Sequence, residues 1–267
     1  MIFLKSFVLA FSMFSKIPMP RVEWSEKNMR YMMCAFPFVG LFLGCVCAGL
    51  CVLKSFFAQE WTLLFPLLLV LAPILVTGGI HIDGFMDTCD ALGSHAPKEK
   101  KLEILKDSHV GSFAVLGIVL YLLCDFVLCF EFIKKYSQFF SLSDGFDFET
   151  LPALIAFSSS FMVSRFLSAL SVCVFPKAKG SGLARTFSDS ASRKITLFWC
   201  VSFLALIFLF LVIFCKKQGV CVVLISLAVF AYYFFMSRRN FGGITGDLAG
   251  WFVQICEILC LLGVCIV

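Results

Sequence analysis

Seven apolar runs, each near the length that crosses a lipid bilayer, constrain this chain more than any other feature of its sequence. The runs lie at residues 31–53, 61–80, 110–130, 151–175, 195–215, 220–236 and 246–267. A helix needs about 20 apolar residues to cross a hydrocarbon core of about 30 Å. The pattern therefore predicts an all-α, polytopic helical membrane protein with about seven transmembrane helices. The run at 220–236 is short and is expected to tilt or to snorkel at its ends.

The sequence between these runs is too short to build a soluble domain. Hydrophobic residues make up 61% of the chain and charged residues 15%, far from the balance of a soluble globular protein. We expect one integral membrane domain over residues 1–267. The first 15 residues carry a short apolar stretch without a small-residue cleavage site, which predicts a retained N-terminal segment that is interfacial or re-entrant.

The distribution of lysine and arginine predicts how the chain is oriented. Loops 16–30, 81–109, 176–194 and 237–245 carry four, four, five and two basic residues. The loops on the opposite side carry only Lys54, Lys134, Lys135, Lys216 and Lys217. The positive-inside tendency places the first set in the cytoplasm. The net charge of +5 is then a topology signal, so the expected partner is the lipid bilayer and not nucleic acid.

The stretch from Gly78 to Asp90 holds the densest group of carboxylates in the chain. Asp83, Asp87 and Asp90 are spaced by four and then three residues, which places them on one face of a helix. A carboxylate set without thiolates suits a hard cation such as Mg²⁺ or Mn²⁺. The alternative is an acidic, solvated helix end. His81, just before the acids, is either a proton acceptor or an ordinary loop histidine.

Two glycine-bearing loops on the same predicted side are candidates for phosphate binding. The loop at 176–186 mixes cations with glycines, although membrane topology alone also explains its charge. The loop at 238–247 leads into the last span, where backbone N–H groups at a helix N-terminus can bind an anion. Asp247 is there either a helix cap or a metal ligand. The residues predicted to bind substrate in these loops are Lys179, Gly180, Gly182, Gly242, Gly243, Thr245 and Gly246.

Arg165 and Asp125 are charged residues inside the predicted spans, where an unpaired charge is costly. Arg165 either reaches a bound phosphate or the acidic cluster, or forms a structural pair with a carboxylate. Asp125 lies nearer the outer end of its run and is expected to snorkel to the far interface. Gly40 and Gly44 form a small-x-x-x-small pair, which predicts close packing of two helices.

Membrane topology brings the carboxylates and both glycine loops to the cytoplasmic face. Carboxylates, cations and backbone donors at one site are the parts of metal-assisted phosphoryl transfer. The same parts fit other Mg²⁺-dependent membrane transferases that act on a diphosphate, of the CDP-alcohol phosphotransferase or intramembrane prenyltransferase type. A cation-coupled transporter is a third alternative, but its acids would lie near the middle of the membrane.

The sequence GGIHIDGFMDTCDALGSH, which starts at Gly78, resembles the acidic signature of the cobalamin synthase (adenosylcobinamide-GDP ribazoletransferase) family. The resemblance covers essentially the whole chain. It continues in the family's order through residues 14–20, 36–40, 106–111, 165, 176–187 and 242–250. The acidic block and the GG-x-TGD block together are its most specific parts.

This resemblance implies that α-ribazole or its 5′-phosphate displaces GMP from adenosylcobinamide-GDP, forming adenosylcobalamin or its phosphate. The enzyme would lie in a prokaryotic cytoplasmic (inner) membrane with its site facing the cytoplasm; whether it forms a homo-oligomer is left open. One of the acids, or His81, would accept the proton of the attacking hydroxyl. The residues implied to hold Mg²⁺, or Mn²⁺ in its place, are Asp83, Asp87, Asp90 and Asp247, and those implied to contact phosphates are Arg165 and Lys179.

Overall fold

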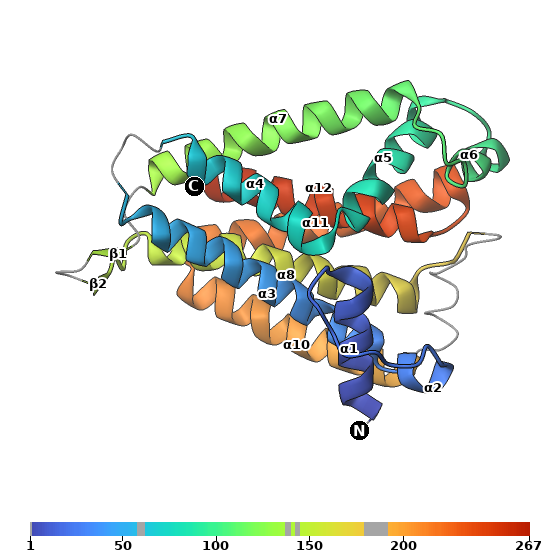
Figure 1. Ribbon diagram of the computed structural model, residues 1–267, viewed down its shortest axis with the longest axis horizontal. Helices are drawn as coiled ribbons and strands as arrows, with labels where there is room; N and C mark the ends of the chain where they lie inside the picture. The colour runs from blue at the N-terminus through green and yellow to red at the C-terminus, as the bar shows by residue number, and fades with distance from the viewer. Residues whose placement is uncertain (1, 58–61, 137–139, 142–144, 179–191) are drawn as a thin grey trace.

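The computed structural model describes residues 2–57, 62–136, 140–141, 145–178 and 192–267, and almost all of them are helical (Figure 1). Within these residues six helices are long and apolar enough to cross a membrane. They are α3 (Met32–Lys54), α7 (Ser112–Lys135), α8 (Leu151–Val174), α10 (Arg193–Phe214), α11 (Lys216–Phe241) and α12 (Gly246–Ile266). The predicted all-α, multi-pass membrane fold is therefore confirmed.

The second apolar run, predicted as one span, is broken into two helices. Helix α4 (Leu64–Thr77) and helix α5 (Ile80–Gly93) meet at a bend of 96°. Gly78 and Gly79 form the bend with φ of 66° and 77°, a left-handed backbone that side chains other than hydrogen disfavour. The second apolar run is therefore not one straight helix, and the bend turns α5, with its acids, away from the direction of α4 (Figure 1).

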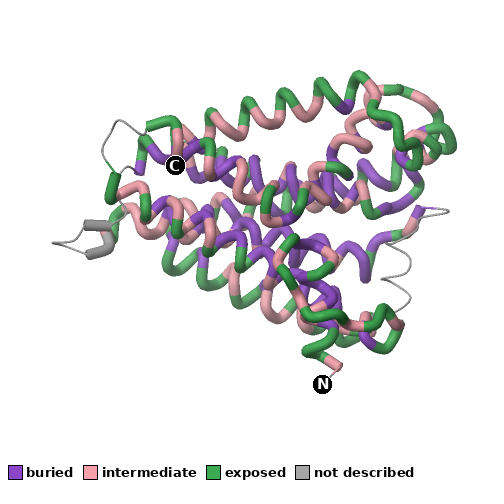
Figure 2. Tube along the Cα trace, in the orientation of Figure 1, coloured by how far each residue is buried: buried purple, intermediate pink, exposed green. Residues whose placement is uncertain are grey.

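Burial separates the central helices from those that face lipid. In their most apolar windows, 72% of residues in α8 and 67% in α12 are buried, against 11% in α7 and 17% in α10. Figure 2 shows the same contrast, with buried residues concentrated along α8 and α12. Helices with apolar residues on every side and little burial face the lipid, so α7 and α10 form outer walls around an α3, α8 and α12 centre.

Close backbone contact holds α3 against α8. A Cβ atom on Gly40 would lie 2.2 Å from the carbonyl oxygen of Phe161, and one on Gly44 would lie 2.3 Å from that of Ser158. Both distances are far below van der Waals contact, so no residue with a side chain fits at either glycine without moving the helices apart. The predicted packing role of this glycine pair is confirmed.

Short elements close the two ends of the bundle. Helix α2 (Glu26–Met29) and helix α6 (Lys98–Ile104) lie at the same end as α5, whereas strands β1 (Phe140–Ser141) and β2 (Gly145–Phe146) pair antiparallel at the other end (Figure 1). Helix α1 (Ile2–Phe14), with 13 residues, is an apolar helix shorter than the spans. It runs across their direction in Figure 1, as an interfacial or re-entrant segment does.

The run at 220–236 is the apolar part of a longer helix. It lies within α11, which has 26 residues and ends only at Phe241. The apolar run is shorter than the helix because both helix ends consist of charged residues, which are not part of an apolar run. These are Lys216, Lys217, Arg238 and Arg239.

Candidate active site at the contact of α5 and α12

Helix α5 presents its three aspartates together. Asp83, Asp87 and Asp90 lie within Ile80–Gly93, and the helical repeat places them on one face over two turns, as the spacing predicts. We call these three residues the acidic face. Asp83 is exposed, while Asp87 and Asp90 are partly buried.

The N-terminus of α12 adds a fourth carboxylate beside the acidic face. A Cβ atom on Gly84 would lie 2.7 Å from both the Cα and the carbonyl oxygen of Asp247, so the two backbones touch there. One turn further along α12, a Cβ atom on Gly250 would lie 2.9 Å from the carbonyl oxygen of His81. Residues without side chains thus let α12 lie directly on α5 and carry Asp247 to the acids.

Thr245 caps helix α12, and Asp247 does not. The Thr245 hydroxyl accepts a hydrogen bond from the N–H of Leu248 at 3.2 Å, and it also lies 3.4 Å from Oδ2 of Asp247. Asp247 sits in the first helical turn. Because the cap is supplied by Thr245, the carboxylate of Asp247 is left for another role.

Repulsion among the four carboxylates is uncompensated by ion pairs. Asp87 interacts unfavourably with Asp83, Asp247 and Asp90, and Asp247 also with Asp83. Within the part of the chain that the structure describes, none of the four carboxylates forms a salt bridge. A cation supplied from solution or with a substrate would relieve this repulsion.

The carboxylates do not form a closed metal cage. Among the described residues, no three His, Cys, Asp or Glu side chains are placed to hold one metal ion. Mg²⁺ seldom uses such a cage: it keeps several waters and binds through one or two carboxylates together with substrate phosphates. The oxygen-only donor set therefore fits Mg²⁺ or Mn²⁺ held jointly by the protein and a diphosphate.

Two cavities meet at Asp83. One has a volume of about 310 Å³, and its lining includes His81, Asp83, Gly246 and Asp247. The other, about 500 Å³ in volume, is more open, and its lining includes Lys16, Gly78 and Asp83. Two separate volumes that share one carboxylate can hold two reactants against the same acidic group.

Lys16 is a cation that the sequence prediction did not single out as a site residue. Its side chain covers Gly78, where a Cβ atom would lie 2.1 Å from the lysine Cε, and its backbone N–H donates to the carbonyl oxygen of Val76 at 2.7 Å. These contacts hold the lysine in the wall of the 500 Å³ cavity. The sequence signal was its position in the segment 14–20, one of those that carry the family resemblance.

The two glycine loops meet, but their glycines serve the fold. The N–H of Ile244 donates to the carbonyl of Pro176 at 2.8 Å, and the N–H of Ala178 donates to the carbonyl of Ile244 at 3.1 Å. A Cβ atom on Gly243 would lie 2.4 Å from the backbone of Lys177. The structure thus confirms that the segments converge. Lys179, Gly180 and Gly182 lie outside the described residues.

The backbone donors of Gly242 and Gly243 are already used. Gly242 has a left-handed φ of 76° and ends α11, with its N–H bonded to Arg238, and the N–H of Gly243 bonds to the carbonyl of Ser237. The expectation that these glycines offer N–H groups to a phosphate is therefore wrong. Gly246 remains at the site, because it lines the 310 Å³ cavity at the start of α12.

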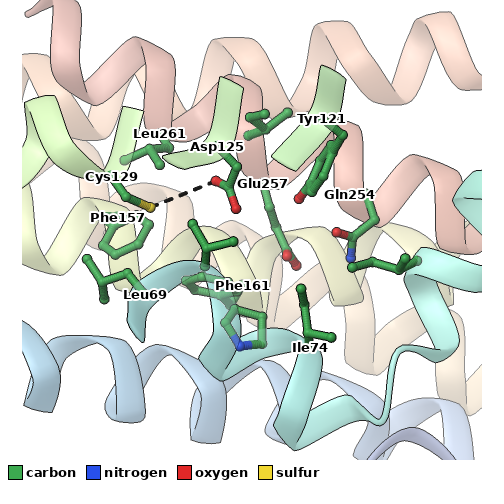
Figure 3. Close-up of a pocket in the computed structure, with 14 residues that line it drawn as sticks. Leu69, Ile74, Tyr121, Asp125, Cys129, Phe157, Phe161, Gln254, Glu257 and Leu261 are labelled. Carbon is green, nitrogen blue, oxygen red and sulfur yellow. Dashed lines mark hydrogen bonds between the residues drawn. The ribbon is translucent and has the colours of Figure 1, made fainter. Parts of the chain in front are cut away.

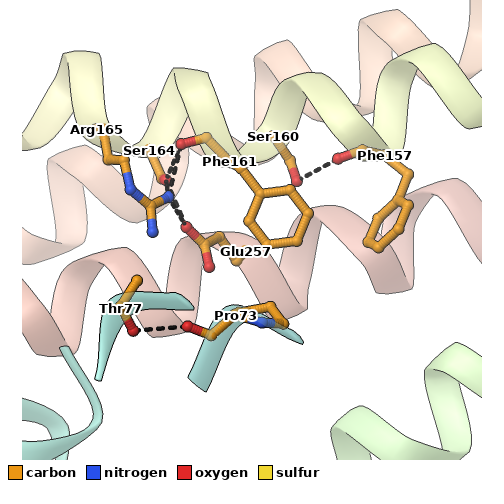
Figure 4. Close-up of polar contacts among 8 residues, drawn as sticks. All are labelled: Pro73, Thr77, Phe157, Ser160, Phe161, Ser164, Arg165 and Glu257. Atoms are coloured by element: carbon orange, nitrogen blue, oxygen red, sulfur yellow. Dashed lines mark hydrogen bonds and ion pairs between the residues drawn. The ribbon is translucent and has the colours of Figure 1, made fainter. Parts of the chain in front are cut away.

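Arg165 lies in the middle of the bundle and pairs with a buried carboxylate. Its guanidinium bonds to Glu257 on α12 and to the carbonyl of Phe161, and Ser164 donates to the same carboxylate at 2.8 Å (Figure 4). Arg165 is fully buried and Glu257 is 6% exposed. The structure thus supports the alternative of a structural pair, which is formed through Nη1; the Nε atom has no hydrogen-bond partner among the described residues.

Asp125 turns into the bundle and not towards the far interface as expected. It accepts a hydrogen bond from the thiol of Cys129 at 3.9 Å and lines a small cavity of about 20 Å³ with Tyr121, Gln254 and Glu257 (Figure 3). Gln254 and Glu257 thus place polar side chains of α12 in the interior of the bundle. A volume of this size is enough for about one water molecule.

His81 belongs to the first turn of α5 and not to a loop. It is 5% exposed, and within the described chain neither ring nitrogen has a hydrogen-bond partner. Its ring lies against that of Phe14, with centroids 6.1 Å apart. The alternative of an ordinary loop histidine is thus wrong for this residue.

The loop that follows α6 reaches the acidic face at Asp90. A Cβ atom on Gly111 would lie 2.0 Å from an oxygen of the Asp90 carboxylate, so only glycine leaves room for it at the start of α7. In the same loop, hydrogen bonds from the backbone N–H and ring of His109 hold the pKa of Asp107 below its ordinary value. The contact of Gly111 with Asp90 thus places the start of α7 beside the acidic face.

Comparison with known proteins gives one consistent result. The family model of cobalamin-5-phosphate synthase matches residues 6–265. The protein named adenosylcobinamide-GDP ribazoletransferase from Lachnoclostridium phytofermentans is 37% identical over 263 residues, which cover 98% of this chain and 94% of the relative. Proteins of the same name from Treponema denticola and Fusobacterium nucleatum are 32% and 31% identical; the matches cover 97% and 96% of this chain and 96% and 95% of the relatives. No solved structure matches.

Proposed function

The chain belongs to the cobalamin-5-phosphate synthase family, and we propose that the acidic face of α5, together with Asp247, is where its transferase reaction takes place. The reaction joins α-ribazole, or its 5′-phosphate, to the adenosylcobinamide phosphate of adenosylcobinamide-GDP and releases GMP. The observation that carries this assignment is the convergence of four carboxylates from α5 and α12 beside two cavities.

The chemical step replaces a phosphoanhydride bond by a phosphodiester bond. A hydroxyl of the ribazole ribose attacks the phosphorus that carries the cobinamide. The bond from this phosphorus to the oxygen of GMP breaks, and the hydroxyl proton leaves. Asp83, which lines both cavities, is the carboxylate best placed to accept that proton. His81, the alternative acceptor, lines only the smaller of the two cavities.

Asp83, Asp87, Asp90 and Asp247 lie close enough to repel one another, and one or two of these carboxylates would hold Mg²⁺ together with the substrate phosphates. The ion, when bound, neutralises the diphosphate and stabilises the charge that develops on the departing GMP. The protein aligns the two reactants, since α12 fixes Asp247 to the backbone of α5 at Gly84. Lys16 is the cation in the open cavity that would contact the diphosphate, and Lys179 keeps the same predicted role.

The positive-inside count supports a cytoplasmic position for this end of the bundle. It contains α5, α6 and the loop before α12 (Figure 1). With bacterial relatives at 30% identity or more, we assign the protein to a bacterial cytoplasmic membrane, with the site open to the cytoplasm, where a soluble nucleotide substrate is available.

Replacement of aspartate by asparagine tests the assignment. Asp83→Asn and Asp87→Asn keep side-chain size but remove charge, so each should lower the rate of GMP release from adenosylcobinamide-GDP and α-ribazole by at least about 100-fold. Asp147→Asn is the matched control, because Asp147 lies at the opposite end before α8, where it accepts a bond from the N–H of Glu149.

Formation of a cobalamin separates this function from the other transferase types and from transport, none of which yields that product. If either acidic-face variant kept wild-type turnover with an unchanged Mg²⁺ requirement, its assigned role would be wrong.

A further inference from the structure

The 310 Å³ cavity has two chemically different sides. Its lining comes from α1, α3, α5, α8 and α12, and on the acidic side it includes Asp83 and Asp247. The rest of the lining, which we call the apolar side, consists mainly of Met13, Phe14, Met33, Phe36 and Val172. A diphosphate alone would make no favourable contact with these apolar side chains, so the cavity fits a ligand with an apolar part and a polar part.

The apolar side presents aromatic rings to the space beside it. The rings of Phe14 and His81 are nearly parallel, with an interplanar angle of 7°. The ring of Phe36 lies 4.3 Å from that of Phe14 and 5.8 Å from that of His81, measured between centroids. Flat aromatic side chains favour stacking or edge contact with another flat ring.

His81 supplies the polar group of this aromatic side. It is 5% exposed and lines the cavity, and both of its ring nitrogens lack a hydrogen-bond partner among the described residues. Buried polar atoms are nearly always bonded, so an exception needs a reason. A ligand that brings one complementary nitrogen into the cavity would supply the missing bond, since a neutral imidazole offers one donor and one acceptor.

On the basis of the proposed function, we propose that this cavity binds the planar nitrogen heterocycle of the incoming ribonucleoside. Phe14 and Phe36 lie against the base, and His81 forms a hydrogen bond with its free ring nitrogen. The base of α-ribazole is a benzimidazole, two fused apolar rings with one nitrogen that accepts a hydrogen bond. A volume of about 310 Å³ is at the small end of ligand pockets, which suits a nucleoside and excludes a corrin macrocycle.

This placement also orients the reaction. With its base against the phenylalanines, the nucleoside directs its ribose towards Asp83, where the 310 Å³ cavity meets the open 500 Å³ cavity. The diphosphate would approach from the open side, past Lys16. The attacking hydroxyl and the phosphorus then meet at the acidic face, and the corrinoid stays outside the aromatic cavity.

A filling substitution on α8 tests the proposal without requiring turnover. Val172 is 5% exposed and lines the cavity, whereas Val174, on the same helix, is 42% exposed and does not. Binding of α-ribazole to the purified full-length protein in lipid nanodiscs is measured by calorimetry, and binding of adenosylcobinamide-GDP is measured separately. Val172→Phe should weaken α-ribazole at least about tenfold and leave the GDP-activated corrinoid within about twofold. Val174→Phe should change neither.

His81→Phe is the second variant, because it keeps a ring of similar shape and removes both nitrogens. It should weaken α-ribazole by about fivefold, the effect of one lost hydrogen bond. In the wild-type protein, free benzimidazole should compete with α-ribazole and free ribose should not.

Equal α-ribazole affinity in wild type, Val172→Phe and His81→Phe would overturn the proposal, and so would an absence of α-ribazole binding to the wild type. Formation of cobalamin by the wild type would leave the proposed function standing in either case. Absence of cobalamin would instead refute the proposed function.

Discussion

The contact between α5 and α12 at Gly84 should control activity more strongly than it controls stability. In Gly84→Ala the new Cβ atom would lie 2.7 Å from the Cα and carbonyl oxygen of Asp247, where ordinary contact begins at 3.4 Å. The N-terminus of α12 must therefore move by about 0.7 Å or more, because both clashing atoms are backbone. Overpacking costs about 1–3 kcal/mol, but alanine gains about 1 kcal/mol over glycine within a helix, so the net loss of stability is modest.

The movement displaces Asp247 relative to Asp83 and Asp87, and misplacement of a catalytic group by about 1 Å can cost about 100-fold in rate. We therefore expect Gly84→Ala to lower GMP release by about 100-fold while the protein remains folded. The assay is steady-state release of GMP from adenosylcobinamide-GDP and α-ribazole, with thermal unfolding measured on the same sample.

Gly49→Ala provides the matched control, because Gly49 is also within a helix and a Cβ atom there meets no atom within 4 Å. It should keep wild-type turnover. If Gly84→Ala turned over like Gly49→Ala, the spacing of α5 and α12 would not set the geometry of the site, and the reasoning would be refuted.

Two further substitutions separate structural from catalytic roles. Arg165→Met leaves the carboxylate of Glu257 buried without its cation and should lower the free energy of unfolding by about 3–5 kcal/mol. Combining it with Glu257→Gln should recover most of that loss. An unchanged free energy of unfolding in Arg165→Met would contradict the structural pair. Gly111→Ala should change stability by less than about 1 kcal/mol, because the atom it meets is the movable carboxylate of Asp90. It should still raise the Mg²⁺ concentration for half-maximal activity several-fold, and an unchanged Mg²⁺ dependence would exclude Asp90 as a ligand.

Features fixed by local chemistry were predictable from the sequence. The apolar runs predicted the spans because each run alone sets the length of a helix in a bilayer. The spacing of Asp83, Asp87 and Asp90 predicted their shared face, because the helical repeat depends on nothing outside the helix. Gly40 and Gly44 predicted close packing, although the sequence did not identify α8 as the partner.

Features that depend on distant partners were not predictable. Arg165 lies 92 residues from Glu257, so its role depends on which face of α12 meets α8. Gly242 and Gly243 looked like anion-binding glycines, but their function is set by the end of α11 and by the strand-like segment at Pro176. Asp125 was expected at the far interface because the sequence shows only its position along one apolar run. Its side chain lines a cavity that residues of α4, α8 and α12 also line.

Lys16 and His81 show the same limit at the site itself. The short segment after α1 carries Lys16 over Gly78, and the bend at Gly78 and Gly79 places His81 beside Phe14 and Phe36. Neither position follows from periodicity, because both depend on how the first helix crosses the spans.

The most direct test of a metal-assisted site at the acidic face is the divalent-ion dependence of the complete reaction. Purified protein is incubated with adenosylcobinamide-GDP and α-ribazole, first with excess EDTA and then with Mg²⁺ restored, and GMP and cobalamin are quantified together. We expect both products in equal amounts with Mg²⁺ and turnover reduced by at least about 100-fold in EDTA. Undiminished formation of cobalamin in EDTA would contradict the proposed role of the four aspartates.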